Sequence, residues 1–171
     1  LKFVRQGSDP NGEARRRFIR EARAAASVEH PNAVGVRDVL EHEETPVIVM
    51  DLLQGETLAA RMRRVGPLPI AEAVQILLPV ISAVGAAHAV GLIHRDLKPE
   101  NVFLTTQGGI LDYPKVLDFG LAKVTEREMR PGSLILTQEG MVFGTPEFMS
   151  PEQARGEKLD GRSDIYSLGV I

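Results

Sequence analysis

The sequence of 171 residues has no cysteine. Without thiols, neither a disulfide framework nor a thiolate metal site is possible, and the absence fits a reducing compartment. The motif G-x-x-x-x-G-K-[ST] is missing as well, which argues against a GTPase or a small-molecule phosphotransferase of the P-loop type. No apolar run has the length needed to cross a bilayer, and residues 1–4 do not have the shape of a signal peptide. We therefore expect a cytoplasmic segment without membrane contact, although a longer parent protein could be membrane-anchored.

The chain has the composition of an ordinary globular protein. Hydrophobic residues make up 43% and charged residues 25% of it, and the net charge is −3, so a sizeable core can form. Arginines cluster between residues 15 and 23, which could indicate a nucleic-acid surface. Glu13 and Glu21 interleave with them and no aromatic platform accompanies them. We interpret the cluster as a solvated helix face and expect no nucleic-acid partner.

Apolar periodicity and turn residues predict a mixture of strands and helices. The longest predicted helix, residues 69–90, has an apolar stripe at three- and four-residue steps, which predicts that one face is buried throughout. Pro79 removes one backbone hydrogen bond and should bend or locally strain this helix. The stripe consists of Ile70, Val74, Leu77, Ile81, Val84 and His88. The other predicted elements are helices at 13–28 and 57–65 and strands at 34–40, 46–52, 102–104 and 110–117.

One part of the chain concentrates chemically active side chains. Residues 94–101 read His-Arg-Asp-Leu-Lys-Pro-Glu-Asn, and residues 118–120 read Asp-Phe-Gly. Together they place a carboxylate, an ammonium and an amide on one short loop and a second carboxylate on a following loop, a set that suits phosphoryl transfer. Either motif alone could be an ordinary turn or a surface salt bridge. The interpretation rests on their combination.

These two stretches resemble the H-R-D-L-x-x-x-N catalytic loop and the D-F-G motif of protein kinases. The resemblance spans essentially the whole chain and points to bacterial serine/threonine kinases of the eukaryotic-like (Hanks) type. It implies an α+β fold, namely a truncated two-lobed protein kinase fold. Residues 1–50 would belong to the small lobe, residues 51–171 to the helical large lobe through the start of helix F, and residues 118–152 would be the activation segment. The kinase loop G-x-G-x-x-G is not in the chain.

The same resemblance implies the catalytic roles. Asp96 would accept the proton of the substrate hydroxyl, while Asn101 and Asp118 would hold Mg²⁺, or Mn²⁺, against the phosphates of ATP. Lys98 would stabilise the charge of the migrating phosphoryl group, and a lysine here is typical of the serine/threonine branch. Thr145 would bridge Asp96 and Lys98.

Nucleotide-binding residues are also implied by the resemblance. Lys2 matches the strand lysine that pairs the ATP phosphates, and Glu21 matches its partner on the kinase helix C. The alternative, that Lys2 is only a terminal lysine and Glu21 an ordinary helix glutamate, stays open. The residues implied around adenine and ribose are Met50 as gatekeeper, Asp51 and Leu53 at the adenine edge, Glu56 near the ribose and Phe103 under the adenine ring.

The segment 118–152 lacks sustained periodicity, and in kinases such a segment is regulatory. Arg95 would receive a phosphate placed there. The candidate carriers are Thr125, Ser133 and Thr137, and we favour Thr137 because its spacing to Gly144-Thr145 resembles the phosphorylated loops of bacterial kinases. Glu139 would partly substitute for a second phosphate. By resemblance, Asp164 would support the backbone of the catalytic loop from the start of helix F.

The sequence therefore predicts an ATP-dependent protein serine/threonine kinase, with protein substrates and with self-association for trans-autophosphorylation. The alternative is a non-catalytic, pseudokinase-like binding or scaffold module that keeps the fold. Degraded motifs would favour that alternative, whereas Asp96, Lys98, Asn101 and Asp118 are all present. Because parts of the kinase pattern are absent, we expect the fragment alone to be weakly stable and poorly active.

Overall fold

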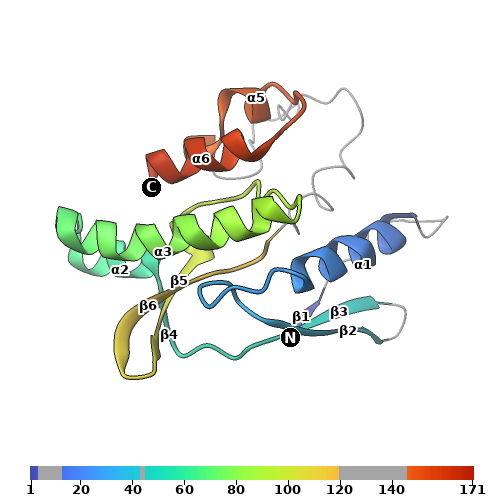
Figure 1. The fold of residues 1–171 in the computed structure, drawn as a ribbon, viewed down its shortest axis with the longest axis horizontal. Coiled ribbons are helices and arrows are strands. Elements are labelled where there is room, and N and C mark those ends of the chain that lie inside the picture. Colours follow the sequence, from blue (N-terminus) through green and yellow to red (C-terminus); the bar gives the residue numbers. More distant parts are fainter. Residues whose placement is uncertain (4–12, 43–44, 120–145) are drawn as a thin grey trace.

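The computed structural model describes residues 1–3, 13–42, 45–119 and 146–171, and its described part combines two small antiparallel sheets with a group of helices (Figure 1). This agrees with the expected α+β class. The strands are β1 (Lys2–Phe3), β2 (Val36–His42), β3 (Thr45–Met50), β4 (Gly55–Thr57), β5 (Val102–Gln107) and β6 (Ile110–Val116). The helices are α1 (Glu13–Ala26), α2 (Leu58–Val65), α3 (Ile70–Ala89), α5 (Pro151–Ala154) and α6 (Gly161–Val170), with 3₁₀ turns η1 (Pro99–Asn101) and η2 (Pro146–Phe148).

The first sheet has the strand order β1-β3-β2, and its strands pair antiparallel. α1 packs on this sheet through Phe18 and Ala22, which are buried together with Ile48 of β3. The spacing of these two side chains, four residues apart, places them on one face of the helix. The predicted helix at 13–28 and the two strands that follow it are thereby confirmed.

The second sheet has the order β4-β5-β6. β4 was not predicted, because three residues are too few for an alternating pattern to show. Gly55 in β4 has a φ of +143°, and a Cβ there would lie 2.0 Å from the carbonyl oxygen of Leu104. Only glycine therefore lets this strand approach β5 so closely.

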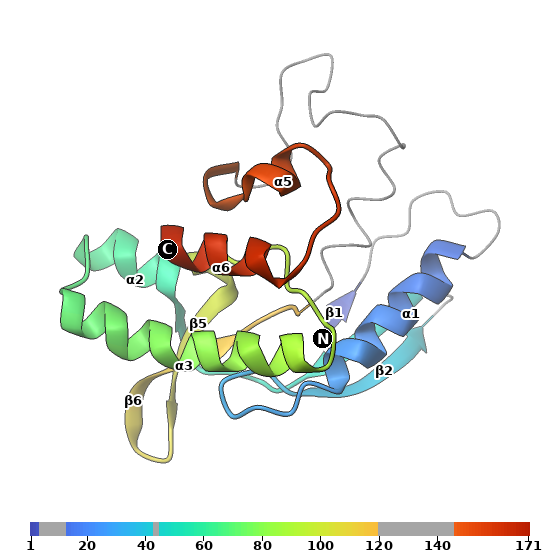
Figure 2. The ribbon, with the colours of Figure 1, turned by 45° about the horizontal axis from the view of Figure 1, so that its top comes forward.

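The helical part packs against the second sheet. α3 contacts β6 on one side and α6 on the other, and Figures 1 and 2 both show α3 and α6 side by side. Its buried side chains meet Leu97, Val102 and Val116 in one hydrophobic core. α2 begins after Thr57, whose hydroxyl accepts the backbone N–H of Ala60 as an N-cap.

The prediction that the apolar stripe of α3 is buried throughout is wrong, because three of its six residues are exposed. Ile70 is 85%, Val74 46% and Ile81 48% exposed. Four of the five buried residues are alanine or valine, and these small side chains let the helix approach its neighbours closely. The sequence prediction followed the large apolar residues and therefore missed this buried face of small residues. The buried residues of α3 are Ile76, Val80, Ala83, Val84 and Ala87.

α3 also corrects the expectation that no apolar run is long enough to cross a bilayer. Among the described residues it is a 20-residue helix with a mean hydropathy of 1.8, sufficient in length and composition. Such a helix is weak evidence for a membrane span, since core helices of globular domains pass the same test. In the described structure 28% of its apolar window is buried. Glu72 is its only acidic residue. The helix runs on through Pro79.

The loop after α1 ties the two sheets together. Ala33 forms a parallel bridge with Val116 of β6, and Nδ2 of the buried Asn32 donates a 2.8 Å hydrogen bond to the carbonyl of Pro114. His30 accepts the N–H of Asn32 at Nδ1, and its Nε2 lies 3.1 Å from Oγ of Ser82 on α3. These contacts position the first sheet against the part that carries the loop 94–101.

Candidate active site

The loop between α3 and β5 brings three of the predicted catalytic side chains together. Nζ of Lys98 lies 3.0 Å from Oδ1 of Asp96, and Nδ2 of Asn101 donates a 3.0 Å hydrogen bond to Oδ2. The turn η1 sets this geometry, because the N–H of Asn101 donates back to the carbonyl of Lys98 at 2.9 Å. The Asp96 side chain is 40% exposed, so a hydroxyl from another molecule can reach it.

The orientation of Asn101 leaves an oxygen available for a metal. Its amide nitrogen donates to both the backbone carbonyl of Asp96 at 2.7 Å and the Asp96 carboxylate, so Oδ1 is the atom that can bind a cation. The N–H of Leu117 donates to the carbonyl of Asn101 at 2.9 Å, which brings Asp118 next to this loop. Two oxygen donors suit Mg²⁺, which is usually bound by few protein ligands together with substrate phosphates. No group of three or more His, Cys, Asp or Glu side chains that could hold a metal occurs among the described residues.

Asp118 and Phe119 are held against the catalytic loop. Asp118 has a φ of +57°, a left-handed conformation that non-glycine residues adopt rarely. Phe119 is 3% exposed, and its ring meets His94 edge-on at 5.1 Å between ring centres. The buried phenyl ring therefore fixes the chain beside the preceding carboxylate.

His94 joins the two loops in its neutral form. Burial lowers the pKa of its imidazole. Nδ1 accepts the N–H of Asp96 at 3.3 Å, so the proton belongs on Nε2, which donates to the carbonyl of Leu117 at 2.7 Å. One imidazole thus links the peptide of Asp96 to the residue before Asp118.

The buried Asp164 on α6 holds the backbone of the catalytic loop. Its Oδ2 accepts the N–H of His94 at 2.9 Å, and its Oδ1 accepts the N–H of Arg95 at 2.8 Å. His88 of α3 lies 2.7 Å from Oδ2 through Nε2. The sequence interpretation had placed His88 on the apolar stripe and missed this contact, since no local pattern marks it.

Gln153 on α5 is a second residue that sequence reasoning missed. Its Nε2 donates a 2.8 Å hydrogen bond to the carbonyl of Arg95, and the residue is 9% exposed. The stretch Ser-Pro-Glu-Gln at 150–153 predicts a capped helix start, but not where the glutamine side chain points. Nε of Arg95 is buried without a hydrogen-bond partner among the described residues.

The residues predicted around the nucleotide line the connection between the sheets. Met50 ends β3, and the N–H of Asp51 already donates to the carbonyl of Gly35 at 3.0 Å, so the carbonyl of Asp51 is the group it can offer to a ligand. Phe103 lies on β5, in register with Thr57. The half-buried Leu53 lies between β3 and β4.

Glu56 is engaged by two arginines of α2. Its Oε1 accepts from Nε of Arg61 at 2.7 Å and from Arg64 at 2.6 Å, and hydrogen bonds from Arg64 and Arg61 lower the pKa of the carboxyl. Arg61 also contacts Glu72 and Asp112, and its hydrogen bonds to Asp112 and Glu56 raise its pKa. The ribose role of Glu56 stays a prediction.

Several predicted residues cannot be compared with the structure. Thr137, Glu139 and Thr145 lie outside the described residues. Lys2 lies in β1 opposite Ile48, and its pairing with Glu21 stays a prediction because the Lys2 side chain is not described.

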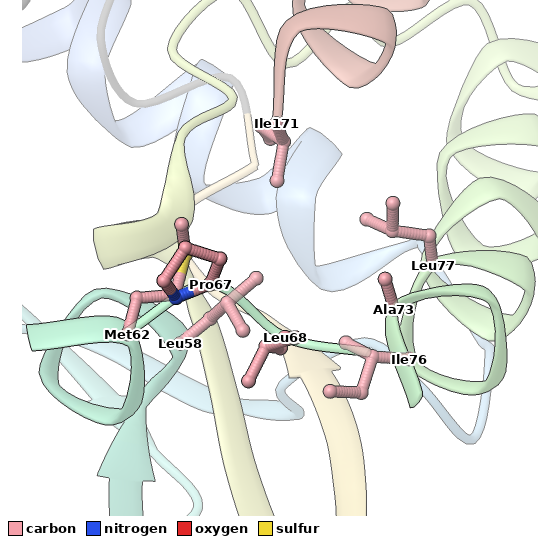
Figure 3. A pocket seen from close by; sticks show the side chains of 8 residues that line it. All are labelled: Leu58, Met62, Pro67, Leu68, Ala73, Ile76, Leu77 and Ile171. Carbon is pink, nitrogen blue, oxygen red and sulfur yellow. The ribbon is translucent and has the colours of Figure 1, made fainter. Parts of the chain in front are cut away.

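A separate apolar pocket of about 230 Å³ lies away from these residues, between α2, α3 and the end of α6 (Figure 3). Its lining includes Met62, Leu77 and Ile171 and none of the predicted site residues. The chemistry is therefore concentrated at the catalytic loop and not at this pocket.

The family follows from this geometry and from comparison with known proteins. The family model described as "Protein kinase domain" matches residues 1–171. The chain belongs to the protein kinase domain family. The kinase domain of PknI from Mycobacterium tuberculosis, solved as a double mutant, matches with a TM-score of 0.69 at 32% identity, covering 93% of this chain and 56% of that chain. The predicted truncated kinase fold is thereby confirmed.

Curated relatives agree with this assignment. The serine/threonine-protein kinase pkn3 of Myxococcus xanthus is 46% identical over 156 residues, which are 91% of this chain and 28% of that protein. The probable serine/threonine-protein kinase PknB of Lactococcus lactis is 41% identical over 171 residues, 100% of this chain and 26% of that protein. The chain thus spans roughly a quarter of the length of these relatives. Their names give no support to the alternative of a non-catalytic module.

Proposed function

We propose that the full-length protein carrying this chain transfers the γ-phosphoryl group of ATP to serine or threonine hydroxyls of protein substrates. The observation that carries the proposal is the position of Asp96, with Lys98 and Asn101 each 3.0 Å from one of its carboxylate oxygens. These partners orient the carboxylate while it stays open to solvent. Asp96 can therefore accept the proton of an incoming hydroxyl as a general base.

The neighbouring side chains supply the remaining electrostatics. Oδ1 of Asn101 and the carboxylate of Asp118 would hold Mg²⁺, with Mn²⁺ as a substitute. Bound Mg²⁺–ATP provides the phosphoryl group and neutralises charge on its phosphates. Lys98 would stabilise the negative charge of the group in transfer. The proposed nucleotide-binding residues are Lys2, Glu21, Met50, Asp51, Leu53, Glu56 and Phe103.

Regulation by phosphorylation of the segment 118–152 is part of the proposal. The buried Nε of Arg95 has no partner among the described residues, and a phosphate placed nearby would satisfy it. On the sequence argument alone, Thr137 is the proposed phosphate carrier, Glu139 a partial substitute and Thr145 a contact of Asp96 and Lys98. Phosphorylation in trans would require self-association.

The test is phosphate transfer from Mg²⁺–ATP in the full-length protein, with modified sites mapped by mass spectrometry. The proposal predicts phosphate on Thr137 or a neighbouring hydroxyl of the segment and on serine or threonine of a generic basic protein. Tight nucleotide binding without any transfer would contradict it and favour the binding module.

A further inference from the structure

The peptide group directly before Asp96 has both of its polar atoms bound by side chains. Nε2 of Gln153 donates to the carbonyl of Arg95 at 2.8 Å, and the N–H of Asp96 donates to Nδ1 of His94 at 3.3 Å. Because these two groups share one rigid peptide plane, the two hydrogen bonds fix how that plane is rotated. The direction in which the Asp96 side chain leaves the backbone depends on this rotation.

Arg95 needs such support because its backbone is unfavourable on its own. Its φ is +70°, in the left-handed region that a residue with a Cβ adopts at a cost. Asp164 holds its N–H at 2.8 Å and Gln153 holds its carbonyl. Hydrogen bonds to its N–H and to its carbonyl therefore hold Arg95 in the left-handed conformation that precedes Asp96.

The local sequence explains why the residue at 153 is glutamine. Ser150 caps α5, and its Oγ accepts the N–H of Gln153 at 3.3 Å. In a capping box, a Glu or Gln at this third helical position turns back to the N-cap residue. Here the amide nitrogen of Gln153 donates to the catalytic loop, which a glutamate carboxylate cannot do. The side chain is 9% exposed, so bulk water is poorly placed to replace the bond.

α5 is itself attached to α6, the helix that holds the other side of Arg95. Oγ of Ser163 donates to Oε1 of Glu152 at 2.6 Å, and Oγ of Ser167 donates to the carbonyl of Phe148 at 2.7 Å. A closed circuit of hydrogen bonds therefore runs from the catalytic loop through α6 to α5 and back through Gln153.

We infer that Gln153 is a positioning residue that couples the end of the segment 118–152 to the orientation of Asp96. When α5 is in place, Gln153 completes the pair of hydrogen bonds that hold Arg95. When α5 is displaced, the Arg95 carbonyl loses its donor, and the peptide before Asp96 is free to rotate. The catalytic part of this inference rests on the proposed kinase function, whereas the structural coupling does not.

The test compares Gln153→Glu and Gln153→Leu in the full-length protein with Gln107→Glu, the same chemical change at an exposed position. Gln153→Glu keeps the side-chain size and the capping pattern but removes the donor, and Gln153→Leu removes the donor without adding charge. Hydrogen–deuterium exchange of peptides covering residues 93–98 and 150–156 is measured together with kcat and KM for ATP.

Both variants at 153 should speed exchange in the 93–98 peptide and lower kcat, each about tenfold. KM for ATP should change less than about twofold, because the nucleotide contacts are not touched. Gln107→Glu should resemble the wild type.

Two results would overturn the inference. In the first, Gln153→Leu remains folded and shows wild-type exchange in the 93–98 peptide. In the second, exchange rises uniformly over the domain and kcat per folded molecule is unchanged, which describes a residue of general stability only. A wild-type protein that transfers no phosphate would refute the proposed function, and the exchange result would still decide for or against the coupling.

Discussion

Asp164 on α6 accepts the backbone N–H of Arg95 at 2.8 Å with one carboxylate oxygen, while the other oxygen accepts the N–H of His94 at 2.9 Å. The two donors are consecutive residues of the catalytic loop, 70 and 69 positions away in the sequence. Asp164 is 1% exposed, so these N–H groups have no ready replacement partner. The helix α6 therefore anchors the backbone of the catalytic loop through Asp164.

Removal of this carboxylate should destabilise the domain and disable the loop. Asp164→Ala leaves the backbone N–H groups of His94 and Arg95 without their acceptor, and we expect the free energy of unfolding to fall by about 2–4 kcal/mol. Asp164→Asn keeps one acceptor oxygen and should lose about half as much. Urea denaturation of the full-length protein measures both, with the exposed Asp38→Asn as the matched control. An alanine variant as stable as this control would show that α6 does not anchor the loop.

The buried His94 makes stability depend on pH. Its pKa is lowered by burial from the ordinary value of 6.5, so below about pH 6.5 the unfolded chain binds a proton that the folded state resists. The contribution of neutral His94 to the free energy of unfolding is therefore complete above pH 6.5 and is lost as the pH falls below that value. We expect the stability difference between wild type and His94→Phe to shrink from pH 8 to pH 5. An equal difference at all pH values in urea denaturation would contradict this assignment.

Arg61 should contribute to stability through its carboxylate partners. Its side chain is 16% exposed and contacts Glu56, Glu72 and Asp112, so Arg61→Met removes the cation that these three carboxylates share, and only Glu56 keeps a second arginine partner, Arg64. We expect a loss of about 1–2 kcal/mol in unfolding free energy at low salt, and a smaller loss in 1 M NaCl because salt screens these charge interactions. Arg63→Met, at an exposed position of the same helix, is the control. Equal stability of the two variants would exclude a structural role for this cluster.

Much of the fold was predictable because local patterns determine it. The helix at 13–28 and the strands around it have clear periodicity and turn residues at their ends, and the structure confirms them. The buried face of α3 was predicted wrongly, because it consists mostly of alanine and valine, and large side chains such as Ile70 are exposed. In the folded protein α3 buries the face whose small side chains let it pack closely against β6 and α6.

In the candidate site, too, local sequence predicts some features and the fold alone determines others. Asp96, Lys98 and Asn101 lie within one short loop, so their proximity follows directly from the sequence. The supports of this loop come from distant elements. His88 reaches Asp164 from α3, and Gln153 reaches Arg95 from α5. Contacts across fifty or more positions depend on the fold, and no local motif encodes them.

The central claim is that Asp96 acts as the general base of a protein kinase, and the most direct test is Asp96→Asn in the full-length protein. With Mg²⁺–ATP and a generic basic protein substrate, we expect kcat to fall by about 10²–10⁴-fold, while the Kd for Mg²⁺–ATP stays within about threefold of the wild-type value. Asp38→Asn should leave both quantities unchanged. Phosphoryl transfer at the wild-type rate by Asp96→Asn would contradict the account.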